Sequence, residues 1–215
     1  MLPPFSPWIL LGLVVVLGAS CLMFWTHVRR WTQNRAWVAL GDWAGENRFK
    51  LHRPGRAGVP APLEVLTQPA PRAVILMSDR TTSIVQMETP VFGAMREVRR
   101  WNVLVRRIDV DWPTTALRPS NQERSLVDLF SLASFPALLS SERFTVHGDQ
   151  SAAARAVVGS MLMALLPQDL GLVLHGRALI LDFSTRPFDG IELSRMRGLV
   201  EQLVGRLPMR TRSEK

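Results

Sequence analysis

The chain has 215 residues, with 26 Lys and Arg against 18 Asp and Glu, a formal net charge of +8 and one cysteine. A single cysteine excludes an intrachain disulfide and a cysteine-based zinc site. Seven basic and two acidic side chains fall within residues 27–56, so the basic excess favours contact with anionic lipid and argues against nucleic acid as a partner.

The first predicted element is a transmembrane helix over residues 8–25, after a short extracytoplasmic segment over 1–7. Residues 1–25 contain no Asp, Glu, Lys or Arg, and an apolar helix of this length spans roughly 27 Å, close to the hydrocarbon thickness of a bilayer. Trp8 and Trp25 mark the two ends of the run, where indole rings favour the membrane interface.

Basic side chains follow the apolar run but do not precede it. Arg29, Arg30 and Arg35 are the nearest of them, so the positive-inside rule predicts an external N-terminus, with the remaining chain on the cytoplasmic side of the inner membrane. Trp31 is expected at the interface, and the three arginines at the surface of the lipid bilayer. Small residues before Cys21 leave lipidation of this thiol open as an alternative.

A connector helix and a linker are predicted next. Residues 26–47 carry a basic, Trp-rich helix, because Ala36, Leu40 and Trp43 recur on one face. Over residues 48–71 a short strand precedes a proline-rich linker.

Residues 72–208 are predicted to form the soluble domain, and residues 209–215 a disordered basic tail. Alternating apolar residues favour strands, whereas a period near 3.6 favours helices. The first part of the domain is expected to contain strands over 73–77, 82–87, 101–111 and 142–147, and helices over 91–100 and 125–132.

The last third of the sequence has the clearest pattern. A helix is predicted from Asp149 to Leu166, and a hairpin over 172–181 turns at Gly176. Asp189 and Glu192 resemble a capping box that opens a final amphipathic helix. The predicted fold class is α+β, a single N-terminal transmembrane helix followed by a two-layer α+β soluble domain.

The order of these elements carries a resemblance. An anchor, a Trp- and Ala-rich helix, a hairpin, the segment Arg143-Phe144-Thr145-Val146-His147-Gly148-Asp149, an alanine-rich helix, a hairpin and a helix ending at Leu207-Pro208 follow one another. This pattern resembles a diffuse group of bacterial single-span membrane proteins with a cytoplasmic α+β domain. The resemblance covers most of residues 28–208 and implies this architecture without an activity.

The densest polar segment lies between the predicted hairpin and the last helix. Arg186 could clamp an anion there, with Asp182 and Glu192 as acid and base, although helix capping and an ion pair explain the same residues. No phosphate loop, nucleophile elbow or metalloprotease motif occurs in the chain. Two weaker candidates are His147 with Asp149, as a metal or general-base site, and Asp109 with Asp111, as a Mg²⁺ site.

We therefore predict a membrane-tethered cytoplasmic interaction or scaffold module without catalytic activity, and expect neither cofactor nor metal. The alternative is a membrane-surface enzyme that uses Asp182, Arg186 and Glu192. A protein partner is expected, and Gly12, Gly18, Ala19 and Ser20 offer small residues for self-association into a homo-oligomer.

Overall fold

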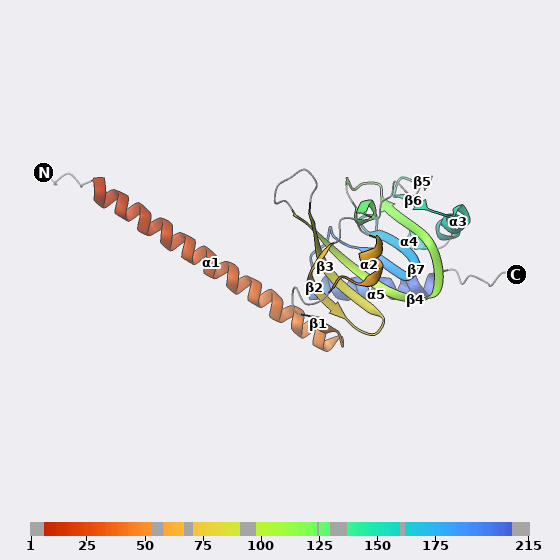
Figure 1. Ribbon diagram of the computed structural model, residues 1–215, viewed down its shortest axis with the longest axis horizontal. Coiled ribbons are helices and arrows are strands. Elements are labelled where there is room, and N and C mark those ends of the chain that lie inside the picture. Colours follow the sequence, from red (N-terminus) through yellow and green to blue (C-terminus); the bar gives the residue numbers. More distant parts are fainter. Residues whose placement is uncertain are drawn as a thin grey trace. The chain divides into compact units, whose positions relative to one another are not determined.

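The computed structural model (Figure 1) describes residues 7–52, 58–66, 71–90, 98–123, 125–129, 137–159 and 162–207; within these, the side chains of 7–13, 29–34, 65–66 and 159 are left out of the description. The chain divides into two compact units, Met1–Trp43 and Ala44–Lys215. Helix α1 (Pro7–Glu46) is 40 residues long and ends just inside the second unit.

No helix in the described part of the chain is both long and apolar enough to cross a membrane. For these residues, the finding contradicts the transmembrane helix predicted over 8–25 and the single-pass membrane arrangement derived from it.

The side chains predicted to face lipid are only partly described. Trp25 is 61% exposed, and Arg35 is exposed as well. The side chains of Trp8, Trp31 and the pair Arg29 and Arg30 lie outside the described residues.

The second unit is built on a seven-stranded sheet in which every strand pair is antiparallel. The strand order is β1-β2-β3-β4-β6-β5, and β7 pairs with β4 off this path. The strands are β1 (Lys50–His52), β2 (Arg72–Ser78), β3 (Thr82–Pro90), β4 (Val98–Pro119), β5 (Ala137–Ser140), β6 (Phe144–Gly148) and β7 (Gly171–Asp182).

Strand β4 is 22 residues long and connects the two parts of the sheet. Residues 103–106 pair with β3 on one side and with β7 on the other. Further along, residues 115–117 pair with β6 and again with β7. Strands β3 and β6 therefore share one edge of β4, whereas β7 occupies the other.

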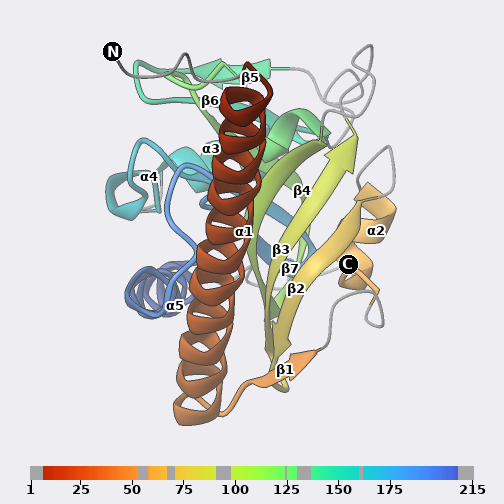
Figure 2. The same ribbon diagram turned by 90° about the vertical axis from the view of Figure 1, so that its left-hand side faces the viewer.

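Helices cover both faces of this sheet. Figure 2 shows α2 (Ala61–Leu66) and α5 (Gly190–Arg206) on opposite sides of the strands. The remaining short helices are η1 (Leu126–Leu129), α3 (Ser151–Gly159) and α4 (Leu162–Leu165). This sheet dominates the fold, which corrects the predicted fold class of a transmembrane helix followed by a two-layer α+β domain.

Each face of the sheet has an apolar core. The α2 side buries a cluster that includes Leu63 of α2, Trp101, Val103 and Val105 of β4, and Leu126 of η1. On the other side, α5 packs against β4 and α4. Its buried apolar side chains are Leu193, Met196, Val200 and Leu203.

Helix α1 ends in a defined turn at the start of the second unit. Arg48 has φ +63°, and the Phe49 backbone N–H donates to the Ala44 carbonyl at 2.8 Å. Arg197 of α5 donates to Asn47 Oδ1 at 2.9 Å, and its guanidinium lies 5.6 Å from the Phe49 ring centroid. These contacts fix the chain where it leaves the helix and enters β1.

Several predicted elements are confirmed. Strands β2, β3 and β6 match the strands expected over 73–77, 82–87 and 142–147. The expected N-cap of the last helix is also present, because Asp189 Oδ1 accepts from the Glu192 backbone N–H at 2.9 Å.

Other predictions are wrong where distant strands decide the conformation. The helix expected over 91–100 is a strand at its end, because Val98–Arg100 pair with β3; residues 91–97 lie outside the description. The strand expected to close at Pro113 continues to Pro119. It does so because Pro113 falls in a register shift, where a residue without an N–H is tolerated.

The hairpin expected at Gly176 is wrong as well. Residues Gly171–Asp182 form one 12-residue strand. Gly176 has φ +54° and pairs with Trp112 at a register shift between β4 and β7. The glycine therefore permits a bulge within a long strand instead of a turn between two short ones. Of the helix predicted over 149–166, the structure describes α3 and α4, and residues 160 and 161 lie outside the description.

Candidate functional site

Strand β7 ends at Asp182, whose side chain is buried. Its Oδ2 accepts hydrogen bonds from the Leu126 backbone N–H at 2.7 Å and from Ser125 Oγ at 3.2 Å. Its Oδ1 accepts from the Ser184 backbone N–H at 3.0 Å and from the Ser184 hydroxyl. Burial raises the pKa of Asp182, although these four donors favour the ionised form. The carboxylate thus links the end of β7 to η1.

Arg186 lies in the loop between β7 and α5, and its side chain is 25% exposed. Nε and Nη2 donate to Oδ2 and Oδ1 of Asp169 at 2.7 and 2.9 Å, a bidentate contact. Nη1 donates to Glu192 Oε1 at 2.7 Å. The hydrogen bond from Arg186 holds the pKa of Asp169 below its ordinary value, and the same bond raises the pKa of the guanidinium.

Glu192 occupies the first turn of α5, and its side chain is only 6% exposed. Besides the contact with Arg186, Oε2 accepts from Arg195 Nη1 at 3.3 Å. The buried carboxylate is therefore shared by two arginines, one from the preceding loop and one from its own helix.

The structure brings two of the three predicted site residues into contact. Arg186 and Glu192 form an ion pair, whereas Asp182 binds a separate set of donors. The polar groups of all three side chains bind neighbouring groups of the protein. Together these contacts connect η1, the turn before β7 and the start of α5.

The weaker candidates are dispersed. Asp109 and Asp111 are exposed on β4, Asp149 is exposed after β6, and His147 is half-buried on β6. Over the described residues, no group of three or more His, Cys, Asp or Glu side chains is arranged to hold a metal ion.

A cavity of about 590 Å³ lies on the α2 side of the sheet. Val105 of β4 and Ala178 of β7 belong both to its lining and to the buried apolar cluster of that face. The cavity thus continues the α2-side core towards the ends of β3, β4 and the β7 bulge. Its lining residues are Pro60, Ala61, Pro62, Asp79, Arg80, Thr81, Thr82, Ser83, Val105, Arg107, His175, Gly176, Arg177 and Ala178.

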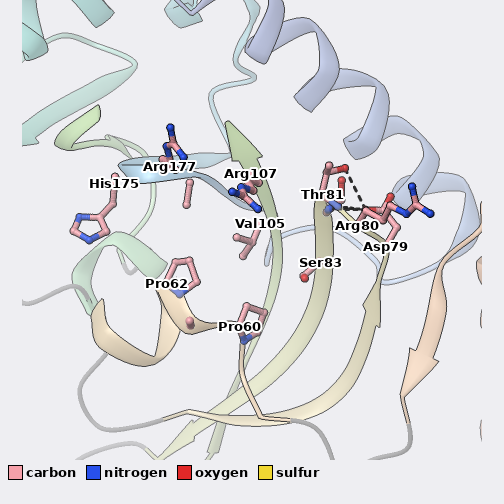
Figure 3. Close-up of a pocket in the computed structure, with 14 residues that line it drawn as sticks. Pro60, Pro62, Asp79, Arg80, Thr81, Ser83, Val105, Arg107, His175 and Arg177 are labelled. Carbon is pink, nitrogen blue, oxygen red and sulfur yellow. Dashed lines mark hydrogen bonds between the residues drawn. The ribbon is translucent and has the colours of Figure 1, made fainter. Parts of the chain in front are cut away.

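The charged side chains of this lining are mainly basic. Arg80, Arg107 and Arg177 line the cavity, and among the described residues the only lining carboxylate is that of Asp79. Asp79 Oδ1 accepts from the Thr81 and Thr82 backbone N–H groups at 2.7 and 2.6 Å, so it is engaged in the β2–β3 turn. In Figure 3, Arg107 and Arg177 lie on one side of Val105, and the prolines of the α2 segment lie on the other.

Sequence reasoning missed this cavity because its lining comes from four separated segments, 60–62, 79–83, 105–107 and 175–178. The available signal was the pair of basic groups in Arg106-Arg107 and His175-Gly176-Arg177. It indicated surface charge, because nothing in the spacing shows that β4 and β7 are neighbours.

Comparisons with known proteins give a fold and no family. No family model matches the chain, and no curated protein matches it. Among solved structures, the chain is similar to the mycobacterial trehalose monomycolate transport factor A, TtfA, with a TM-score of 0.51 and 11% sequence identity. The likeness covers 76% of this chain and 89% of that one. At this identity it shows a related fold alone.

Proposed function

We propose that this chain is an interaction module that acts by binding a partner and not by catalysis. One observation carries the proposal: the residues that most resemble a catalytic site are engaged in structural contacts. Arg186 makes three hydrogen bonds to two carboxylates, and Asp182 accepts four. A general acid or base needs a polar atom that faces its substrate.

The alternative, an enzyme that uses Asp182, Arg186 and Glu192, requires these contacts to be exchanged for contacts with a substrate. Arg186 would have to leave Asp169 or Glu192, and if it left Glu192, that carboxylate would remain buried beside Arg195 alone. No described contact favours that exchange.

The similar solved structure supports the proposal in a limited way. That protein is named as a transport factor, a name that states no reaction. A protein of this fold can thus serve a process without a named chemical step. The cytoplasmic location inferred from the charges around residue 26 stays a prediction.

Two exposed apolar positions are suited to test where a partner binds. Leu139 lies on β5, which ends the strand order and whose outer edge pairs with no other strand of the described residues, so that this edge is available to another chain. Ile191, in the first turn of α5, is 70% exposed. Gln202, an exposed polar residue of the same helix, is the matched control.

The experiment is in-cell photo-crosslinking with a photoreactive side chain at each of these three positions in the full chain. One protein adduct of defined mass from Leu139 or Ile191, absent from Gln202, supports the proposal; an adduct of twice the chain mass identifies a second copy as the partner. Equal labelling at all three positions contradicts it. So does substrate turnover by the purified chain that Glu192→Gln abolishes without changing the melting temperature.

A further inference from the structure

The arginines of the 590 Å³ cavity differ in their partners from five other arginines of the sheet domain. Arg100, Arg106, Arg118, Arg186 and Arg195 each form an ion pair with a carboxylate. For Arg80, Arg107 and Arg177, no ion pair occurs within the described ranges of the chain.

Strand irregularity brings two of these cations to the same cavity. Arg107 is the register partner of Ala178, and successive side chains of a regular strand point to opposite faces. Regular alternation would therefore place Arg177 on the face opposite to Ala178. The register shifts after Arg107 and the positive φ of Gly176 break the alternation, and both residues line the cavity.

Two guanidinium groups on one wall repel each other and favour an anion between them. Arginine binds carboxylate and phosphate through parallel N–H donors. The nearby carboxylate of Asp79 does not fill this role, because it accepts hydrogen bonds from the backbone of its own turn. The charge of the cavity is thus complementary to an anionic group supplied from outside.

The rest of the cavity is suited to an apolar body. Val105 and Ala178 are 6% and 5% exposed, and Pro60 and Pro62 lie across from Val105 in Figure 3. The volume falls within the roughly 300–1,000 Å³ of small-molecule sites. The lining residues that the structure describes include no Phe or Trp, and the ring of His175 is hydrogen-bonded to Thr114 Oγ1 at 2.8 Å. This argues against a nucleotide, whose base would need a stacking surface.

We propose that this cavity binds a small anionic amphiphile, with its carboxylate or phosphate on Arg107 and Arg177 and its apolar chain over Val105 and Ala178. This site goes beyond the proposed interaction function and does not depend on it, because a small ligand and a protein partner can bind at separate places.

The test is isothermal titration calorimetry of the full chain with decanoate and with decyl phosphate at low salt. Decanol and inorganic phosphate serve as probes that carry only the chain or only the charge. We expect both amphiphiles to bind more tightly than either partial probe. The tighter of the two heads identifies carboxylate or phosphate as the natural group.

Variants separate a built site from general surface charge. The double variant Arg107→Gln, Arg177→Gln should weaken both amphiphiles by about tenfold or more, whereas Arg155→Gln, at an exposed position of α3, should not. Ser83→Leu should block binding by filling the cavity without altering its charge. Unchanged melting temperatures show that the variants fold.

Three results would overturn the proposal. Decanol that binds as tightly as decanoate would show that Arg107 and Arg177 contribute nothing to binding. Inorganic phosphate that binds as tightly as decyl phosphate would show that Val105 and Ala178 contribute nothing to binding. Amphiphile binding that Ser83→Leu leaves intact in a folded protein places the ligand outside the cavity.

Discussion

Replacing Arg186 by methionine should lower the free energy of unfolding by about 3–5 kcal/mol, because it leaves a buried carboxylate without its main partner. The Glu192 side chain is 6% exposed and would keep only Arg195, at 3.3 Å on a side chain that is 69% exposed. Asp169 is 36% exposed and can regain water, so its loss of Arg186 should add no more than about 1 kcal/mol.

A second substitution shows whether the stranded charge causes the loss. Glu192→Gln removes that charge and should cost about 1–3 kcal/mol, from the weakened hydrogen bond to Arg186. The double variant Arg186→Met, Glu192→Gln should then be less destabilised than the sum of the two single variants, because no buried anion remains to be left alone.

Urea unfolding of the full chain measures these differences from the transition midpoints, provided that the slope of the transition is unchanged. A small domain has about 5–15 kcal/mol of total stability, so Arg186→Met should lower the urea midpoint by a large fraction of its wild-type value. Arg155→Met, at an exposed position of α3, is the control and should stay within about 0.5 kcal/mol. An Arg186→Met midpoint equal to that of Arg155→Met would refute the reasoning.

Three further outcomes are expected. Leu203 of α5 is fully buried, so Leu203→Ala should cost about 2–5 kcal/mol while exposed Gln202→Ala stays within about 0.5 kcal/mol; equal urea midpoints would show that Leu203 contributes no packing. Gly176→Ala puts a Cβ on a residue with φ +54° and should cost about 1 kcal/mol or more, whereas Gly198→Ala meets nothing within 4 Å in α5 and should stabilise by up to about 1 kcal/mol. Thermal melts compare the two, and a Gly176→Ala melt like that of the wild type contradicts the requirement for glycine at this bulge. Burial raises the pKa of Asp182 above its ordinary 3.8, so its stabilising contribution is complete below the ordinary value and is lost as the pH rises through the folded value. The difference in unfolding free energy between wild type and Asp182→Asn should fall as the pH rises above the ordinary value of 3.8, and a difference that stays constant at every pH where the protein is folded would rule out the raised pKa.

Local patterns were sufficient for elements that depend on local contacts. The spacing of Leu193, Met196, Val200 and Leu203 predicts α5 because one helix face is buried along its whole length. Gly176 gave the opposite result: a glycine between two apolar runs is typical of a hairpin turn. The pairing of β7 with β4, about 70 residues earlier in the chain, makes it a bulge instead.

The site residues follow the same division. Arg186 and Glu192 are six residues apart, and their contact could be anticipated from the sequence. The second carboxylate on Arg186, that of Asp169, comes from the turn before β7 and had no local signal. The cavity had even less local signal in the sequence, because Arg107 and Arg177 come to line it together only through strand pairing and a register shift.

The long pairing of β4 has a consequence for synthesis on the ribosome. When β4 emerges, β3 is already available for one of its edges, but the other edge has no partner until β7 is complete at Asp182. During that interval a long strand presents unpaired N–H and C=O groups, which is the condition under which nascent chains pair with one another. A chain stopped before Gly171 would keep this edge open permanently. The last strand to be made therefore protects the middle of the protein from aggregation, and translation through it must outpace encounters between unfinished copies.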